Sequence, residues 1–262
     1  MRHHIPGLTA DLSPCIEWLF ADGDRPFADR VRRAADAGFA RAEFWGTTDK
    51  DVSALERAIR ETRVVVSAFV SEPAGRLVDP ATHDEFLAGV ASSSRLAHRL
   101  NARGLIVLAG QFRAGVPRRD QRAAIVEGLR RAAPIASAAG TRLYLEPLNT
   151  RTDHEGYFLD STAEGLDIVR EVGHPSVTLL YDMYHSVVMG EEPAQALGGS
   201  GHLVGHVHLA DAPGRHEPGT GRIDWPRQLA ALHDSGYSGP IGLEYRPTTG
   251  TEASLEYIRA LT

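Results

Sequence analysis

Four residues with metal-binding side chains end four successive apolar segments of the chain. They are Glu146 in LYLEPLN, Asp182 in LLYDMYH, His208 in GHVHLAD and Glu244 in IGLEYRP, separated by 36, 26 and 36 residues. Each separation is about the length of one strand and one helix, so in a barrel of parallel strands these side chains converge at one end. Three carboxylates around an imidazole repel one another near neutral pH unless a cation lies between them. The pattern therefore predicts a divalent metal site.

The predicted ligand set is rich in oxygen and contains one imidazole, which favours Mn²⁺, Mg²⁺ or Co²⁺ and fits Zn²⁺ less specifically. For a single carboxylate at a strand end, a salt bridge or a helix cap is an equally good explanation; four at matching positions favour the metal. His206 lies two residues before His208 and faces the same side of the strand, so one binds the metal while the other supports the pocket. Asp211 is a candidate partner for the second nitrogen of the ligating histidine.

Two further residues have side chains suited to binding a substrate. His185 follows Asp182 by three residues and either donates a hydrogen bond to a substrate oxygen or caps the next helix. Arg215 lies in the Gly/Pro-rich segment APGRHEPGTG at 212–221. Its guanidinium group either clamps a carboxylate or phosphate, or fixes the loop in solvent. Four other residues near expected strand ends either line the pocket or pack in the core, namely Glu43, Trp45, Phe69 and Phe112.

Short apolar or β-branched segments alternate with longer helical patterns along the whole chain. Strands are expected at 7–12, 40–45, 63–70, 104–109, 141–146, 177–182, 204–209 and 240–245. Several of them are almost continuously hydrophobic, as in a parallel sheet covered on both faces. Eight strand-helix units predict a single (β/α)8 TIM barrel over residues 1–262, a length that fits this fold.

The segments between the strands have the period of a helix. Apolar stripes occur at Phe27, Val31 and Ala34, at Phe86, Val90, Ala97 and Leu100, and at Ile125, Leu129, Ala132 and Ala136. Gly38 and Gly140 follow two of these stripes and are suited to the left-handed exit of a helix. The segment 160–162 and Asp224 are expected to cap the helices that follow them.

The composition excludes several classes of protein. Cys15 is the single cysteine, so an internal disulfide and a thiolate zinc cluster are excluded. The net charge of −6 and the absence of a basic run argue against a nucleic-acid binder. No segment has the roughly 20 apolar residues that span a bilayer, and the start does not resemble a signal peptide. We therefore expect a cytoplasmic protein with no nucleic-acid or membrane partner.

Motifs through most of the chain resemble the hydroxypyruvate isomerase group of the xylose-isomerase-like TIM barrels. They are TADLS at 9–13, GF-x-x-x-EF around Glu43, LEPLN at 145–149, YDMYH at 181–185, GHVHLADAPGRHEPGTGRID at 205–224 and GLEYRP at 242–247. The long segment at 205–224 is the most specific of these. The chain departs from the group at His208, where glutamine is usual, and at AFVSEP, where a histidine is usual at the end of the third strand.

The resemblance implies that Glu146, Asp182, His208 and Glu244 bind one divalent metal ion. It also implies that Glu146 and Glu244 transfer protons, while His185 and Arg215 bind the substrate. The expected reaction converts hydroxypyruvate into tartronate semialdehyde, or a close analogue, through a metal-bound enediolate. A homo-oligomer is expected from the resemblance alone.

Three alternatives stay open at this point. A ketose or keto-sugar-acid 3-epimerase uses the same parts, and histidine at position 208 favours it. An apurinic-site endonuclease of the same superfamily needs several zinc ions and a basic surface, against which the net charge argues. A non-catalytic sugar-acid binding protein would have little use for two glutamates on a metal.

Overall fold

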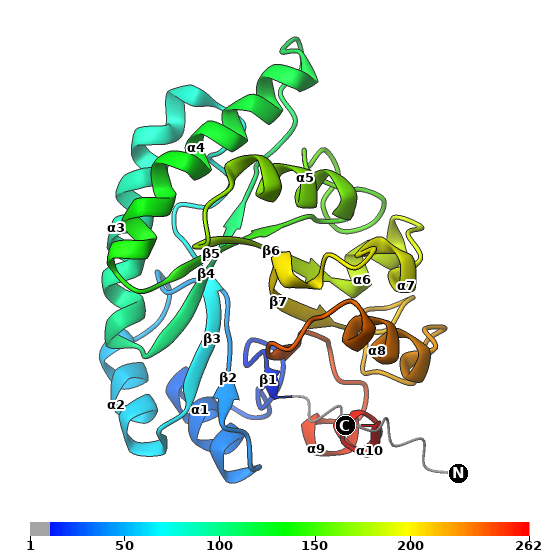
Figure 1. The fold of residues 1–262 in the computed structure, drawn as a ribbon. Coiled ribbons are helices and arrows are strands. Elements are labelled where there is room, and N and C mark those ends of the chain that lie inside the picture. Colours follow the sequence, from blue (N-terminus) through cyan, green and yellow to red (C-terminus); the bar gives the residue numbers. More distant parts are fainter. Residues whose placement is uncertain (1–10, 262) are drawn as a thin grey trace.

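The computed structural model describes residues 11–261, and its strands form a ring with helices outside it (Figure 1). The strands are β1 (Leu12–Pro14), β2 (Arg41–Ala42), β3 (Val65–Val70), β4 (Ala102–Leu108), β5 (Arg142–Glu146), β6 (Val177–Asp182), β7 (Val204–Leu209) and β8 (Ile241–Leu243). All pair in parallel in the order β1-β8-β7-β6-β5-β4-β3-β2. Between β1 and β2, a parallel bridge joins Cys15 to Glu43 and closes the ring. The predicted (β/α)8 barrel is confirmed.

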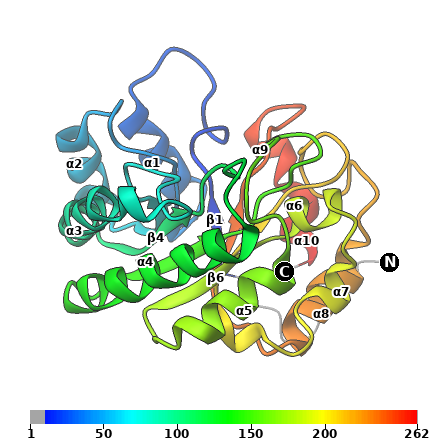
Figure 2. The ribbon, with the colours of Figure 1, turned by 90° about the horizontal axis from the view of Figure 1, so that it is seen from above.

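Helices connect the strands and cover the outside of the ring. They are α1 (Phe27–Asp36), α2 (Val52–Thr62), α3 (His83–Arg99), α4 (Arg118–Ala138), α5 (Thr162–Val172), α6 (Met183–Val188), α7 (Pro193–Ala196), α8 (Trp225–Asp234), α9 (Thr251–Ser254) and α10 (Glu256–Leu261), with 3-10 turns at Pro80–Thr82 and Gly201–Leu203. From above, the long helix α4 lies outside the strands between α3 and α5 (Figure 2), and it packs against both. The predicted apolar stripes of α1, α3 and α4 lie in the core.

Two of the predicted helix caps have the expected geometry. The Ser161 side chain accepts a hydrogen bond from the backbone of Glu164 at the start of α5, and Asp224 does the same for Arg227 at the start of α8. Gly38 and Gly140 have φ values of 88° and 71°, in the left-handed region that glycine tolerates best. Local sequence therefore sets these helix ends.

Three strand predictions are wrong in their bounds. The first strand begins at Leu12 rather than ending there, and residues 7–10 of the prediction lie outside the described residues. At the other two, regular pairing stops early: β2 ends at Ala42 and β8 at Leu243. Both are short because the residues beyond them turn to line the mouth of the barrel. Glu43 and Glu244 therefore lie just past the ends of their strands.

The apolar core has two parts on the two sides of the strands. The larger part lies between the strands and the outer helices. The smaller part fills the barrel interior and contains Ala68, Ile106, Tyr144 and Leu180, which lie on the consecutive strands β3, β4, β5 and β6. Because residues two apart on a strand face the same side, the interior positions lead from this layer to the carboxyl ends of the strands. The barrel thus aims the polar residues at these positions into one site.

Candidate metal centre and active site

The four predicted ligands lie together at the carboxyl end of the barrel. Glu146 and Asp182 are the last residues of β5 and β6, His208 lies near the end of β7, and Glu244 follows β8. His208 Nδ1 lies 3.6 Å from Glu146 Oε1, 3.8 Å from Asp182 Oδ2 and 3.4 Å from Glu244 Oε2. One ligand atom from each of the four buried residues lies within 4.8 Å of all the others.

This donor set fits a divalent cation. Neither ring nitrogen of His208 has a hydrogen-bond partner among residues 11–261, although the side chain is buried. Burial alone would lower the pKa of His208, but the carboxylates of Glu244 and Glu43 outweigh it and raise that pKa well above its usual value. Three carboxylates and an imidazole without hydrogen-bond partners lie close enough together to bind one metal ion. The ion would replace the proton on His208.

Glu43 links both histidines of β7 from behind the centre. Its Oε2 lies 2.8 Å from His206 Nε2, and its Oε1 lies 3.1 Å from His208 Nε2. Burial would raise the pKa of Glu43, yet the two histidines lower it to about 2. Nε2 of His208 thus faces a carboxylate while Nδ1 faces the ligand cluster, an arrangement that orients a metal-binding imidazole. Of the two histidines, His208 therefore faces the ligand cluster, and His206 supports the pocket through Glu43.

The proposed role of Asp211 as partner of the ligating histidine is wrong. Its carboxylate accepts hydrogen bonds from the backbones of Ala212 and Gly219 and from Trp225 Nε1. Asp211 lies past the end of β7, where the chain has turned away from the barrel axis, so its side chain organises the following loop. Glu43, which is distant from His208 in the sequence, is the partner of the second nitrogen of His208 instead.

His185 lies in the first turn of α6, beside Asp182. The Asp182 carboxylate accepts a hydrogen bond from the backbone of His185, so Asp182 caps this helix. His185 Nδ1 is within hydrogen-bond distance of the backbone nitrogen of Asn149, 3.2 Å, and of its side-chain nitrogen, 2.6 Å. Because a backbone N–H only donates, Nδ1 is the acceptor and Nε2 carries the proton. Burial and the charge of Arg215 lower the pKa of His185 to about 3, so the ring is neutral.

His185 Nε2 is therefore a free donor at the site. It is buried, lies 3.6 Å from Asp182 Oδ2 and has no hydrogen-bond partner among the described residues. The sequence offered two roles for His185, substrate donor or helix cap. Asp182 performs the capping, which leaves the imidazole free to face the cavity that it lines.

Arg215 lies inside the site rather than in solvent. Its Nη2 donates to Glu244 Oε2 and lies 3.5 Å from Asp182 Oδ2. Its guanidinium group packs between the rings of Trp18 and Tyr184, 5.2 Å and 5.1 Å from their centroids. Nε has no hydrogen-bond partner among residues 11–261 and is a donor available to a ligand. Arg215 and His208 also outweigh the effect of burial and hold the pKa of Glu244 well below its usual value.

A cavity of about 640 Å³ opens above the cluster. It is lined by Glu146, Glu244, His185 and Arg215, together with aromatic walls that include Trp18 and Trp45. Its volume lies in the range of small-molecule sites. Both glutamates therefore face the same enclosed space as the two predicted substrate-binding residues.

The residues whose roles the sequence left open have different positions. Trp45 lines the cavity and donates from Nε1 to Glu244 Oε1 at 2.6 Å. Phe69 is buried and stacks on Phe44 outside the barrel interior, so it belongs to the core. Phe112 is 46% exposed, stacks on Phe158 and is not among the lining residues. Trp45 is therefore the one aromatic residue of the three that reaches the site.

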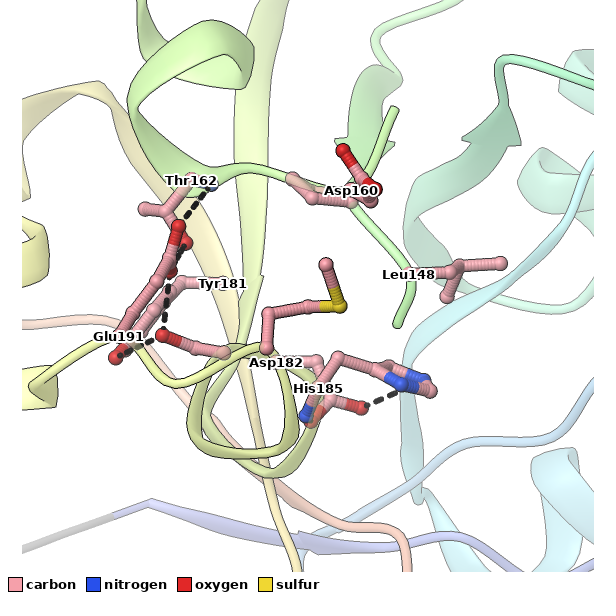
Figure 3. A pocket seen from close by; sticks show the side chains of 10 residues that line it. Leu148, Asp160, Thr162, Tyr181, Asp182, His185 and Glu191 are labelled. Carbon is pink, nitrogen blue, oxygen red and sulfur yellow. Dashed lines mark hydrogen bonds and ion pairs between the residues drawn. The ribbon is translucent and has the colours of Figure 1, made fainter. Parts of the chain in front are cut away.

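A network behind Asp182 and His185 supports the site and was not anticipated. Glu191 accepts hydrogen bonds from the backbone and hydroxyl of Thr162 and from the Ser186 hydroxyl (Figure 3). It thus ties the start of α5 to α6, the helix that carries His185. Asn149 was also missed as a partner of His185, although it stands in the LEPLN motif beside Glu146. No sequence periodicity marks either residue, since their partners lie in the helices α5 and α6.

No helix within residues 11–261 combines the length and the apolar character needed to cross a membrane.

The chain is similar to known proteins along most of its length. The family model described as "Xylose isomerase-like TIM barrel" matches residues 31–261. The hydroxypyruvate isomerase of Escherichia coli (strain K12) is 30% identical over 93% of this chain and 96% of its own length. The 2-oxo-tetronate isomerase of Cupriavidus necator is 30% identical over 90% of this chain and 93% of its own length. A crystal structure of an AP endonuclease, family 2, from Brucella melitensis is 28% identical with a TM-score of 0.88, covering 95% of this chain and 98% of that one.

Proposed function

Because the chain belongs to the xylose isomerase-like TIM barrel family, we propose that it is a divalent-metal-dependent isomerase of a small hydroxy-carbonyl acid. Its substrate would be hydroxypyruvate, with tartronate semialdehyde as product, or a close analogue. Relatives named hydroxypyruvate isomerase and 2-oxo-tetronate isomerase support an isomerase of small keto acids. The observation that carries the mechanism is the pair of buried glutamates, Glu146 and Glu244, that line one cavity with Arg215.

The four clustered residues Glu146, Asp182, His208 and Glu244 would hold the metal ion. When bound, the ion supplies a Lewis acid that polarises the substrate carbonyl and acidifies the neighbouring C–H bond. The candidate ions are Mn²⁺, Mg²⁺, Co²⁺ and Zn²⁺, since carboxylates and an imidazole can bind each of them.

The protein's own side chains would move the protons. One glutamate takes a proton from the hydroxymethyl carbon, C3, and leaves an enediolate; the other delivers a proton to C2. The hydroxyl proton at C3 passes to the oxygen at C2, so the product is an isomer with no net gain or loss of atoms. A positioned general base contributes about 10²–10⁴-fold to the rate. His185 Nε2–H would donate to a substrate oxygen as negative charge develops.

Arg215 would bind the substrate carboxylate and so decide which carbon faces which glutamate. Its unpartnered Nε points to this role, because Nη2 is already bonded to Glu244. The rings of Trp18 and Tyr184 hold the guanidinium plane in place. A fixed planar donor recognises a carboxylate in one orientation.

The direct test measures the incorporation of solvent deuterium into the product. Metal-loaded protein incubated with hydroxypyruvate should form tartronate semialdehyde that carries solvent deuterium at C2, read by ¹H NMR. A chelated sample is the control and should form none. Absence of conversion with each of the four metals would contradict the proposal.

A 3-epimerase is the second candidate, favoured by the imidazole at position 208. It would return the proton to the same carbon from the opposite face. Ketoses supplied in place of hydroxypyruvate should then be turned over while hydroxypyruvate is not. Nicking of abasic DNA would instead indicate an endonuclease, the activity for which the Brucella melitensis protein is named.

A further inference from the structure

A second cavity lies at the opposite end of the barrel, where the strands begin. Its volume is about 470 Å³, and it shares no lining residue with the cavity above the glutamates. Arg41 and Arg142 are the first residues of β2 and β5, and Arg103 is the second residue of β4. All three line this cavity. Parallel strands start at the same end of a barrel, so three arginines distant in sequence are brought together there.

Two of these arginines face the barrel interior. Arg41 lies two residues before Glu43, and Arg142 two residues before Tyr144, so each shares the inward face of its strand. The Tyr144 ring closes the interior above them: it fills the space beside Gly104 and Gly205, where an added Cβ would collide with ring atoms. The basal cavity is therefore separate from the metal centre.

The positive charge of this cavity is largely uncompensated. Arg41 forms an ion pair with Asp11, whereas the exposed side chains of Arg103 and Arg142 form no ion pair or hydrogen bond within residues 11–261. Residues 1–10 and 262 contain no aspartate or glutamate, so no other side-chain carboxylate exists in the chain to pair with them. All three guanidinium groups act on the Tyr144 hydroxyl and oppose the rise in its pKa that burial causes. Their charges thus converge on one small volume.

We propose that this basal cavity binds a phosphate group, either as inorganic phosphate or as part of a small phosphorylated metabolite. Guanidinium groups bind phosphate through paired N–H donors, and two unpaired arginines match the two negative charges of a phosphate near neutral pH. The volume suits a ligand of this size. Two of the lining glycines, Gly140 and Gly236, have open space where a side chain would be. This site is independent of the isomerase proposed above.

The test measures binding of orthophosphate and glycerol 3-phosphate to the full-length protein by calorimetry at low ionic strength. Arg103→Gln and Arg142→Gln should each weaken binding by about tenfold or more, the loss of one charge-assisted pair. The double variant should abolish it. Arg246→Gln, on the rim of the upper cavity, and the exposed Arg119→Gln are matched controls and should leave the affinity unchanged.

The outcomes separate the two sources of phosphate and the two cavities. Tighter binding of glycerol 3-phosphate than of orthophosphate would identify a phosphorylated metabolite, and the reverse would identify the free ion. Loss of binding in Arg246→Gln but not in the basal variants would overturn the proposal, as would no binding or equal affinity for malonate. Arg142→Lys keeps the charge and should retain part of the affinity, which separates loss of the site from misfolding.

Discussion

Glu43 Oε1 lies 3.1 Å from Nε2 of His208, although the two residues belong to β-strand ends at opposite parts of the chain. The contact fixes which nitrogen of His208 faces the ligand cluster. A carboxylate behind a metal-binding histidine orients the ring and raises its basicity. Glu43 is therefore a positioning residue for the proposed metal centre.

Glu43→Gln should lower the affinity for the metal by about 10–100-fold, because the amide no longer stabilises the N–H of the ligating imidazole as a carboxylate does. Calorimetric titration of the chelated protein with Mn²⁺ measures this. Glu85→Gln makes the same change at an exposed side chain paired only with Arg76, and should leave the affinity intact. Equal metal affinity in both variants would remove Glu43 from this role.

Glu244→Gln should reduce turnover of the preferred substrate by about 10²-fold or more, since the variant loses one of the two proton-transfer groups. It also loses the acceptor of Arg215 and one charge of the cluster, so metal binding must be measured alongside. Glu146→Gln should have a similar effect on solvent deuterium incorporation. Full activity in either variant at saturating metal would contradict a mechanism with two glutamates.

Asp211→Asn should destabilise the loop that carries Arg215. The Asp211 carboxylate accepts from three backbone N–H groups and from Trp225 Nε1, and the amide can replace only one of its two acceptor oxygens. We expect a loss of about 1–3 kcal/mol in the free energy of unfolding and a higher KM with a smaller change in kcat. Denaturant unfolding and steady-state kinetics measure these. Asp234→Asn, at the exposed end of α8, is the control; unchanged stability and KM in Asp211→Asn would count against this view of the loop.

Cys15 should resist alkylation in the folded protein. Burial, with the charges of Glu244 and Glu43, raises the pKa of the thiol well above its usual value, so the thiolate is absent through mildly alkaline pH. Iodoacetamide at pH 8 should leave the native protein unmodified by mass spectrometry and should modify it once in 6 M guanidinium chloride. Rapid labelling of the native protein would show that the bridge between β1 and β2 opens readily.

Much of the fold follows from local pattern. The apolar segments and helical stripes predicted eight strand-helix units, and the match to the xylose isomerase-like family over residues 31–261 confirms both the barrel and the resemblance. The shortened β2 and β8 were missed because large apolar residues continue beyond the point where pairing stops, at Phe44 and Trp45 after β2 and at Tyr245 after β8. Closure of the ring, rather than propensity, decides where Glu43 and Glu244 leave their strands.

The site, like the fold, has parts that the sequence predicts and parts that it does not. The four residues at the ends of β5 to β8 could be predicted as one cluster from the strand pattern, because a parallel barrel brings successive strand ends to one mouth. The contacts that support the site could not be predicted in this way: Glu43 lies behind His208, Trp45 donates to Glu244, and Asn149 contacts His185. Trp45 and Glu244 are 199 residues apart and meet because β8 and β2 flank β1 in the closed ring. Contacts of this kind depend on ring closure and side-chain direction, which no local periodicity records.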